Sequence, residues 1–250
     1  MNNTIKESIR RLLPHTIQPH RILSGFLRGK TIFTSWHDYP AAILGTTEND
    51  LINWFANNVK SGETWLDIGA HYGYTALALS ILSAPNGRVF AFEPMIATAG
   101  FLNLTRNVNH LNQLYVIPLA LGSSKQIKLV SLPVTRGMAD STFQQAESVE
   151  NILQTSLDNL WPDLCGSDNH VHGVKIDVQG MEFEVLSGMQ SILSSQKPKI
   201  LLEFHSGVDR SKIIDLLSAC GYRLPGFSLV ESDISHDSQY QDNQSYLFTV

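Results

Sequence analysis

Thr64-Trp-Leu-Asp-Ile-Gly-Ala-His-Tyr-Gly-Tyr-Thr75 is the segment that decides the fold of this chain. Its apolar first half predicts a buried strand, and the pattern from Thr75 onward predicts the start of a helix. Gly69 and Gly73 lie between the two and indicate a turn in which the backbone passes close to another group. A strand, a glycine-containing turn and a helix in immediate succession are typical of a nucleotide-binding site.

The same alternation of strands and helices continues along the chain. Further buried strands are predicted at residues 88–94, 114–122, 174–180, 199–205 and 246–250. Helices are predicted at residues 51–59, 101–111, 181–193 and 213–220. Because strands that are joined through helices pair in parallel, we predict an α/β fold with a doubly wound, mostly parallel sheet covered on both faces.

Two segments depart from this alternation. Residues 1–45 are predicted to form a helical and irregular N-terminal cap, with an amphipathic helix at 4–13, on a main domain at 46–250. Residues 123–170 are predicted to form an insertion over the edge or top of the sheet. At the start of the main domain, Thr47-Glu-Asn-Asp50 matches a capping box for the helix at 51–59. We expect the cap, the insertion and a polar loop at residues 232–245 to determine substrate specificity, because loops at strand ends shape the pocket.

The composition of the chain limits the classes of function. The chain has 250 residues and a formal net charge of −5, which fits one globular domain and argues against nucleic acid as a partner. Its two cysteines indicate a reducing compartment, and no apolar run is long enough to span a bilayer. We therefore expect a cytoplasmic protein that acts on a small-molecule substrate, with a homodimer left open as an alternative to a monomer.

Acidic residues stand at the ends of several predicted strands. Ligands of doubly wound sheets bind outside the carboxyl ends of the strands. This places the acids, together with a glycine and a histidine, along one rim: Asp67, Gly69, Glu93, Asp177, Glu203 and His205. The turn reads Asp67-x-Gly-x-His71-x-Gly73, which departs from the dinucleotide fingerprint Gly-x-Gly-x-x-Gly. The bulky His71 in the middle of this turn favours a ligand without phosphates.

S-adenosylmethionine is such a ligand and fits the rest of the rim. Its ribose hydroxyls can donate to Glu93 at the end of the second strand, and its cationic methionine end tolerates an acid near the turn. The predicted cofactor-binding residues are Glu48, Asp67, Gly69, His71, Gly73, Tyr74, Thr75, Glu93, Pro94 and Ala120. NAD sites share the acid after the second strand, so an NAD-type oxidoreductase and a non-catalytic binding module remain alternatives.

Five motifs in order give the chain a resemblance to a known family. They are Leu66-Asp-Ile-Gly-Ala-His-Tyr-Gly73, Phe90-Ala-Phe-Glu-Pro94, Ser156-Leu-Asp-Asn-Leu160, Val174-Lys-Ile-Asp-Val-Gln-Gly-Met-Glu182 with Val185-Leu-Ser-Gly188, and Leu202-Glu-Phe-His205. Over roughly residues 45–225, the chain resembles the FkbM family of S-adenosylmethionine-dependent methyltransferases. The resemblance implies a Rossmann-like class I methyltransferase fold, a seven-stranded sheet with the last strand antiparallel. It also implies O-methylation of sugars, polyketides or other natural products. Gln179 departs from the family, which usually carries Glu at this position.

Methyl transfer to oxygen needs an in-line approach to the methyl group and removal of the hydroxyl proton. We predict that His205 or Asp177 is the general base and that Glu203 orients its partner. The favourable position of acids at a helix N-terminus explains Glu182 and Glu184. Asp177, Glu203 and His205 could also bind a divalent metal, but we do not expect a metal at this site.

Two features of the sequence argue against methylation of nucleic-acid bases. The strand end Asp177-Val-Gln-Gly180 differs from the Asp/Asn-Pro-Pro-aromatic motif of amino-group methylases of nucleic acids, and no Pro-Cys pair offers a nucleophile for a pyrimidine carbon. Methylation of a nitrogen on a small molecule or peptide remains an alternative to methylation of oxygen.

Overall fold

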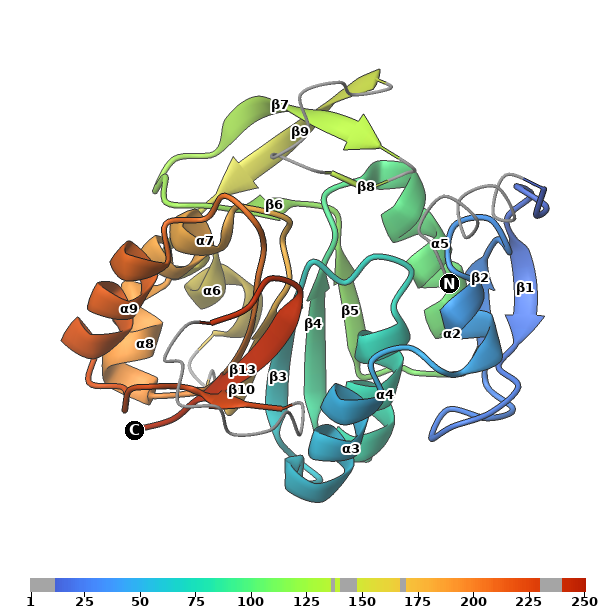
Figure 1. Ribbon diagram of the computed structural model, residues 1–250, viewed down its shortest axis with the longest axis horizontal. Helices are drawn as coiled ribbons and strands as arrows, with labels where there is room; N and C mark the ends of the chain where they lie inside the picture. Colours follow the sequence, from blue (N-terminus) through green and yellow to red (C-terminus); the bar gives the residue numbers. More distant parts are fainter. Residues whose placement is uncertain (1–11, 136–137, 140–147, 167–169, 230–239) are drawn as a thin grey trace.

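A computed structural model describes residues 12–135, 138–139, 148–166, 170–229 and 240–250 of the chain (Figure 1). Its central sheet has seven strands in the order β12-β13-β11-β10-β3-β4-β5. Five of them are parallel: β3 (Thr64–Ile68), β4 (Arg88–Phe92), β5 (Leu114–Ile117), β10 (Gly173–Ile176) and β11 (Lys199–Phe204). The C-terminal strand β13 (Gln244–Phe248) pairs antiparallel with β11 and with the short β12 (Phe227–Ser228). The predicted fold class is confirmed.

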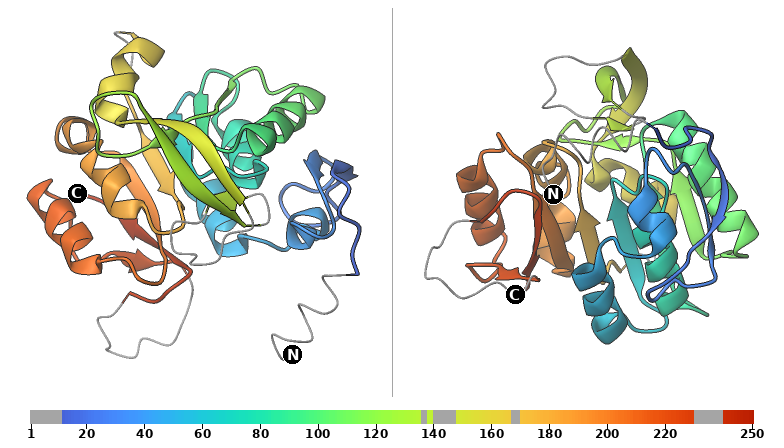
Figure 2. Two further views of the ribbon diagram at one scale, coloured as in Figure 1. Left: turned by 90° about the horizontal axis from the view of Figure 1, so that it is seen from above. Right: turned by 45° about the vertical axis from the view of Figure 1, so that its right-hand side comes forward.

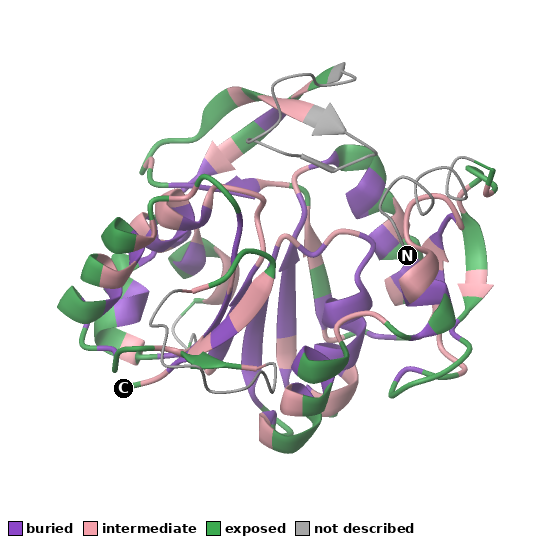
Figure 3. Ribbon diagram, in the orientation of Figure 1, coloured by how far each residue is buried: buried purple, intermediate pink, exposed green. Residues whose placement is uncertain are grey.

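Helices cover both faces of this sheet. One face carries α3 (Asn49–Asn58), α4 (Tyr74–Ser83) and α5 (Ile96–Val108), and the other carries α6 (Leu157–Cys165), α7 (Glu182–Ser187), α8 (Gln190–Gln196) and α9 (Arg210–Ala219). Along β3, Trp65 packs into the first layer, whereas Leu66 and Ile68 pack into the second. The central strands are therefore buried on both sides (Figure 3), which explains their nearly continuous apolar sequences.

Two predicted elements are divided in the structure. The strand predicted at 114–122 breaks after β5, where Pro118 has no N–H to donate, and Ala120–Leu121 joins another sheet as β6. The helix predicted at 181–193 is divided into α7 and α8 at Gly188. A Cβ on Gly188 would lie 1.9 Å from the carbonyl oxygen of Gly122, so the backbone passes directly against another segment there.

The segment predicted as an insertion forms most of a second sheet. This sheet combines β6, which precedes the segment, with β7 (Lys128–Thr135), β8 (Met138–Ala139) and β9 (Ser148–Thr155), in the order β6-β9-β7-β8. In Figures 1 and 2 the β7–β9 ribbon crosses over one end of the central sheet. This is the end where the chain leaves β3 and β4, so the ribbon lies over the predicted binding rim.

The N-terminal segment is more regular than the sequence predicts. In place of an irregular stretch up to Pro40, β1 (Gln18–Arg21) and β2 (Thr31–Thr34) form an antiparallel hairpin, which the short α2 (Pro40–Leu44) follows. The hairpin is held on α5, because the backbone N–H of Phe33 donates to Thr105 Oγ1 at 3.0 Å. The helix predicted at 4–13 falls largely on residues 1–11, which lie outside the described residues.

The capping box predicted at 47–50 is wrong. Helix α3 begins at Asn49, and its N-cap residue Glu48 has a left-handed φ of 53° and makes no side-chain capping hydrogen bond. The Thr47 hydroxyl lies 3.4 Å from the hydroxyl of Tyr39 instead. Glu48 faces the cavity described below, so its carboxylate is not available to the helix N-terminus.

No helix in the described part of the chain combines the length and the apolarity needed to cross a membrane.

Candidate functional site

A cavity of about 270 Å³ opens at the carboxyl ends of β3, β4 and β10. Its lining combines the turn after β3 with residues that follow β4 and β10, among them Glu93 and Asp177. The N-terminal segment contributes Asp38, and the β7–β9 ribbon contributes Leu132 and Gln154. Segments far apart in the sequence therefore enclose one site, at the position expected for ligands of a doubly wound sheet.

Most of the predicted cofactor-binding residues line this cavity: Glu48, Gly69, His71, Tyr74, Thr75, Glu93, Pro94 and Ala120. Gly73 and Asp67 do not. Asp67 is 0 % exposed and accepts a hydrogen bond from Thr75 Oγ1 at 2.7 Å. It lies beneath the cavity, where it holds one of the lining side chains in place.

Lys175 is the partner of Asp67 and was not among the predicted site residues. The two residues are opposite each other in the pairing of β10 with β3, and the Lys175 ammonium lies 3.3 Å from Asp67 Oδ1. It also lies 3.4 Å from Asp177 Oδ2 and donates to the Gly69 carbonyl at 3.1 Å. The sequence signal was a lysine between Val174 and Ile176 in a buried strand, because a buried ammonium requires charged or polar partners.

The charge of Lys175 is maintained by these neighbours. Burial alone would lower the pKa of Lys175, but the carboxylates of Asp67 and Asp177 raise it above its ordinary value. Lys175 is therefore a fixed cation that joins the turn after β3 to the end of β10. Its ammonium is surrounded by three protein oxygens before any ligand binds.

The two glycines of the turn are required by the protein itself. Gly69 has φ 80° and Gly73 has φ 91°, conformations that other residues rarely adopt. A Cβ would lie 1.8 Å from the Asp177 carbonyl oxygen at Gly69 and 2.0 Å from Leu102 Cδ1 at Gly73. The close approach indicated by the sequence is therefore made by neighbouring protein segments, whatever the cavity binds.

The carboxylate of Glu93 lies at the wall of the cavity. Its Oε2 accepts the N–H of His71 at 2.9 Å, and its Oε1 accepts the N–H of Met95 at 3.0 Å. Each oxygen keeps a lone pair for a further donor. Burial raises the pKa of Glu93 to about 7, although both backbone hydrogen bonds act in the opposite direction. This arrangement fits a ligand with two adjacent hydroxyls, such as a ribose.

Ligand binding at Glu93 is expected to release a proton. Two ribose hydroxyls would stabilise the ionised carboxylate, so S-adenosylhomocysteine should bind about tenfold more weakly for each pH unit below about 7. Titration calorimetry at pH 8, 7 and 6 in buffers of different ionisation enthalpy measures both the affinity and the protons released. In Glu93→Gln the affinity should be lower and this pH dependence lost. Equal affinity of the wild-type protein at pH 8 and pH 6 would contradict the role of Glu93.

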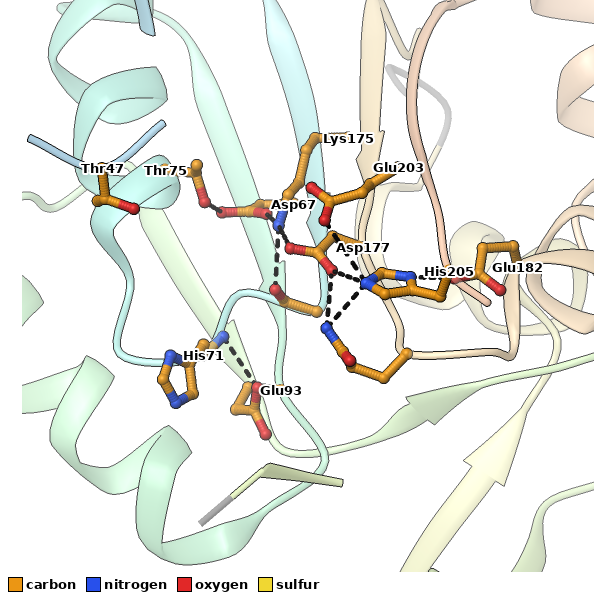
Figure 4. Close-up of polar contacts among 12 residues, drawn as sticks. Thr47, Asp67, His71, Thr75, Glu93, Lys175, Asp177, Glu182, Glu203 and His205 are labelled. Carbon is orange, nitrogen blue, oxygen red and sulfur yellow. Dashed lines mark hydrogen bonds and ion pairs between the residues drawn. The ribbon is translucent and has the colours of Figure 1, made fainter. Parts of the chain in front are cut away.

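The predicted catalytic residues form one cluster, shown in Figure 4. Ligating atoms of Asp177, Glu203 and His205 all lie within 4.8 Å of one another. Only Asp177, with a side chain that is 23 % exposed, lines the cavity. His205 Nε2 lies 3.4 Å from Asp177 Oδ1 and 3.6 Å from Glu203 Oε1, behind Asp177 as seen from the cavity. Gln179 also lines the cavity, and its amide nitrogen lies 2.9 Å from His205 Nε2.

Glu182 belongs to this cluster, although the sequence suggested only a helix-terminal role for it. Its Oε1 lies 2.6 Å from His205 Nδ1, a shorter contact than His205 makes with Glu203. Glu182 is fully buried at the start of α7, where Oε1 also accepts the N–H of Gly180 at 3.1 Å. The motif that carries the family resemblance includes this residue, but its contact with a strand-end histidine was not evident from the spacing.

Three titratable groups of the cluster, Glu203, Asp177 and His205, have shifted pKa values. Burial raises the pKa of Glu203 to about 8, with a further contribution from Asp177. Burial opposes charge on Asp177 as well, but Lys175 and His205 hold its pKa below the ordinary value. Burial lowers the pKa of His205, yet its carboxylate neighbours, Glu182 foremost, raise it overall. At neutral pH the cavity therefore contains an ionised Asp177 in front of a largely protonated Glu203.

A divalent metal is not expected at Asp177, Glu203 and His205, although oxygen and imidazole ligands suit one. Lys175 already provides positive charge next to Asp177. Dialysis against EDTA is expected to leave methyl transfer within about twofold of the untreated rate. A loss of more than about tenfold that Mg²⁺ or Mn²⁺ restores would contradict this prediction.

The chain is similar to known methyltransferases. Residues 67–224 match the family model of the FkbM methyltransferase domain. The hexuronic acid methyltransferase AglP of Haloferax volcanii is 32% identical over 172 residues, which are 68% of this chain and 68% of that protein. A ribosomal RNA small subunit methyltransferase G of Helicobacter pylori is 33% identical over 85 residues, which are 34% of this chain and 47% of that protein.

Two solved structures have a similar fold. The FkbM methyltransferase of Methylobacillus flagellatus aligns with a TM-score of 0.52 and 18% identity over 75% of this chain, which spans 43% of that longer chain. A putative rRNA methylase of Clostridium thermocellum aligns with a TM-score of 0.50 and 12% identity, over 79% of this chain and 91% of that chain.

Proposed function

The chain belongs to the FkbM family of S-adenosylmethionine-dependent methyltransferases, and on that premise we propose that it methylates a hydroxyl group of a sugar, foremost a uronic acid. The observation that carries the proposal is the position of Asp177. It is the ionised carboxylate that lines the cavity next to the turn after β3 and is held there by Lys175 and His205. A uronic acid is the first acceptor to test because AglP is named as a hexuronic acid methyltransferase. The oxidoreductase alternative loses its basis, since the matching family model is that of a methyltransferase.

In the proposed arrangement, the cavity has a cofactor end and an acceptor end. Glu93 would hold the ribose hydroxyls, and the carboxylate of Glu48 would face the cationic methionine end. When bound, S-adenosylmethionine supplies an electrophilic methyl group on its sulfonium. Asp38, Leu132 and Gln154 line the part of the cavity contributed by the N-terminal segment and the β7–β9 ribbon, where an acceptor would be recognised.

The charge of the lining favours a neutral acceptor atom. Among the described lining residues, the acids are Asp38, Glu48, Glu93 and Asp177, whereas the ammonium of Lys175 is already surrounded by three oxygens. A carboxylate at the position of the acceptor atom would meet the negative charge of Asp177, so the carboxylate of a uronic acid is expected to point away from Asp177. A hydroxyl carries no charge, so the proposed product is a methyl ether rather than a methyl ester.

Asp177 performs the proton transfer in the proposed reaction. Its carboxylate accepts a hydrogen bond from the acceptor hydroxyl and takes the proton as the oxygen–methyl bond forms and the methyl–sulfur bond breaks. Lys175 and His205 keep Asp177 ionised before the reaction and fix its two oxygens. The proton leaves Asp177 for solvent after the methyl ether has been released.

The product identifies both the acceptor and the bond formed. The protein is incubated with methyl-labelled S-adenosylmethionine and methyl glycosides of glucuronic acid, glucose and glucosamine. We expect transfer to the glucuronoside and a product that withstands alkaline hydrolysis, as methyl ethers do. Labelled methanol released by alkali would indicate a methyl ester, and label on the glucosaminide nitrogen would indicate N-methylation. Either result would replace the hydroxyl as the proposed acceptor.

A further inference from the structure

The imidazole of His205 lies between carboxylates on both of its nitrogens. Nδ1 is 2.6 Å from Glu182 Oε1, and Nε2 is 3.4 Å from Asp177 Oδ1 (Figure 4). Glu182 comes from the start of α7, His205 from the end of β11 and Asp177 from the end of β10. The three residues thus form a chain of polar contacts from the interior of the protein to the wall of the cavity.

Glu182 determines which nitrogen of His205 carries a proton. The N–H of Gly180 donates to Oε1, and His205 Nδ1 lies 2.6 Å from the same oxygen. The other oxygen, Oε2, has no hydrogen-bond partner among the described residues. Because Glu182 is 0 % exposed, its carboxyl group depends on the Nδ1–H of His205 and the N–H of Gly180 as donors. Nε2 is therefore left to accept the Gln179 amide N–H at 2.9 Å, and the same amide nitrogen lies 3.5 Å from Asp177 Oδ1.

We propose that Glu182 is a positioning residue, which acts through His205 to hold Asp177 in the orientation that takes the acceptor proton. This inference rests on the proposed function, in which Asp177 is the base. With Nδ1 held by Glu182, the imidazole ring cannot turn, and Nε2 accepts the amide N–H of Gln179, whose nitrogen also donates to Asp177 Oδ1 at 3.5 Å. Lys175 holds the other oxygen of Asp177 at 3.4 Å. The carboxylate is thereby fixed from two sides before an acceptor arrives.

A double-mutant cycle tests whether Glu182 acts through His205. We expect Glu182→Gln to lower kcat for the glucuronoside by about 10- to 100-fold, with the KM for S-adenosylmethionine changed by less than about twofold. The double variant with His205→Gln should be no more than about threefold slower than His205→Gln alone. Losses that multiply in the double variant, or a Glu182→Gln enzyme at the wild-type rate, would overturn the proposal.

Glu184 provides a matched control on the same helix. Its side chain is half-buried and is not part of the cluster, so Glu184→Gln should retain the wild-type kcat. Glu182→Gln should also retain the urea midpoint of unfolding, because an amide is less costly to bury than a carboxylate. A midpoint that falls together with kcat would assign Glu182 a structural role and overturn the proposal.

A spectroscopic measurement separates this inference from the proposed function. In protein labelled with ¹⁵N-histidine, the His205 signals are identified by their loss in His205→Gln. We expect Nδ1 of His205 to be protonated in the wild-type protein and this preference to be lost in Glu182→Leu. Unchanged nitrogen shifts in Glu182→Leu would overturn the positioning role. This result needs no acceptor, so failure to methylate any glycoside would contradict the proposed function alone.

Discussion

Asp177→Asn is expected to lower kcat by about 10²- to 10⁴-fold, the range that general-base catalysis contributes. Asparagine has nearly the same shape as aspartate but cannot take the acceptor proton. The affinity for S-adenosylhomocysteine should change by less than about tenfold, because Glu93 and the turn after β3 stay in place. Initial rates at saturating cofactor, together with calorimetric titration of the same variant, measure the two effects separately.

The position of His205 sharpens this test. Because His205 does not line the cavity, His205→Gln should lose less activity than Asp177→Asn. The opposite order would make His205 the general base, with Gln179 moving away from Nε2 when an acceptor binds. A His205→Gln enzyme at the full rate would show that this histidine takes no part in proton transfer. Full activity of Asp177→Asn would remove Asp177 from that role.

Lys175→Met is expected to lower the free energy of unfolding by about 3–5 kcal/mol, the range for removing one partner of a buried ion pair. Methionine fills a similar volume, so the loss comes from Asp67, which is 0 % exposed and would be left without its cation. A domain of this size is stable by about 5–15 kcal/mol, so the variant should unfold at a clearly lower urea concentration. Equilibrium urea unfolding followed by tryptophan fluorescence measures the change.

Two further variants distinguish this explanation from general disruption of the strand. Lys199→Met changes a half-buried lysine at the start of the neighbouring strand β11, whose ammonium contacts the Asn58 carbonyl at 3.5 Å, and should cost less than about 1 kcal/mol. Adding Asp67→Asn to Lys175→Met should restore part of the lost stability, because the unpaired buried charge is removed. Equal destabilisation by Lys175→Met and Lys199→Met would contradict the ion-pair explanation.

The sequence was sufficient to locate the five parallel strands along the chain, because each is marked by apolar residues and most have a polar residue at the end. Asp177, Glu203 and His205 could be placed together because the ends of neighbouring parallel strands meet at one edge. For Gly69 and Gly73, the sequence predicted the turn but not the group that approaches the backbone. Their backbone angles agree with a tight turn, but the group that approaches them is protein, and only a three-dimensional structure identifies it.

Contacts across long distances in the sequence could not be predicted. Lys175 reads as a single polar residue in an apolar strand, and its pairing with Asp67 depends on the register between β10 and β3. Glu182 reads as an acid at a helix start until the end of β11 brings His205 against it. Glu48 fits a helix cap in the sequence, but the left-handed backbone at this residue places the carboxylate in the cavity. In each case a local preference is overridden by packing.

The Lys175 ammonium has a consequence for redesign of this enzyme. It contacts the Gly69 carbonyl in the turn after β3 and Asp177 at the end of β10, so one side chain joins the proposed cofactor and base positions. The β7–β9 ribbon and the segment between β2 and α2 contribute other parts of the lining, and the described contacts of this ammonium do not include them. Chimaeras that exchange the ribbon with that of a related enzyme should therefore change acceptor preference while the reaction geometry is retained.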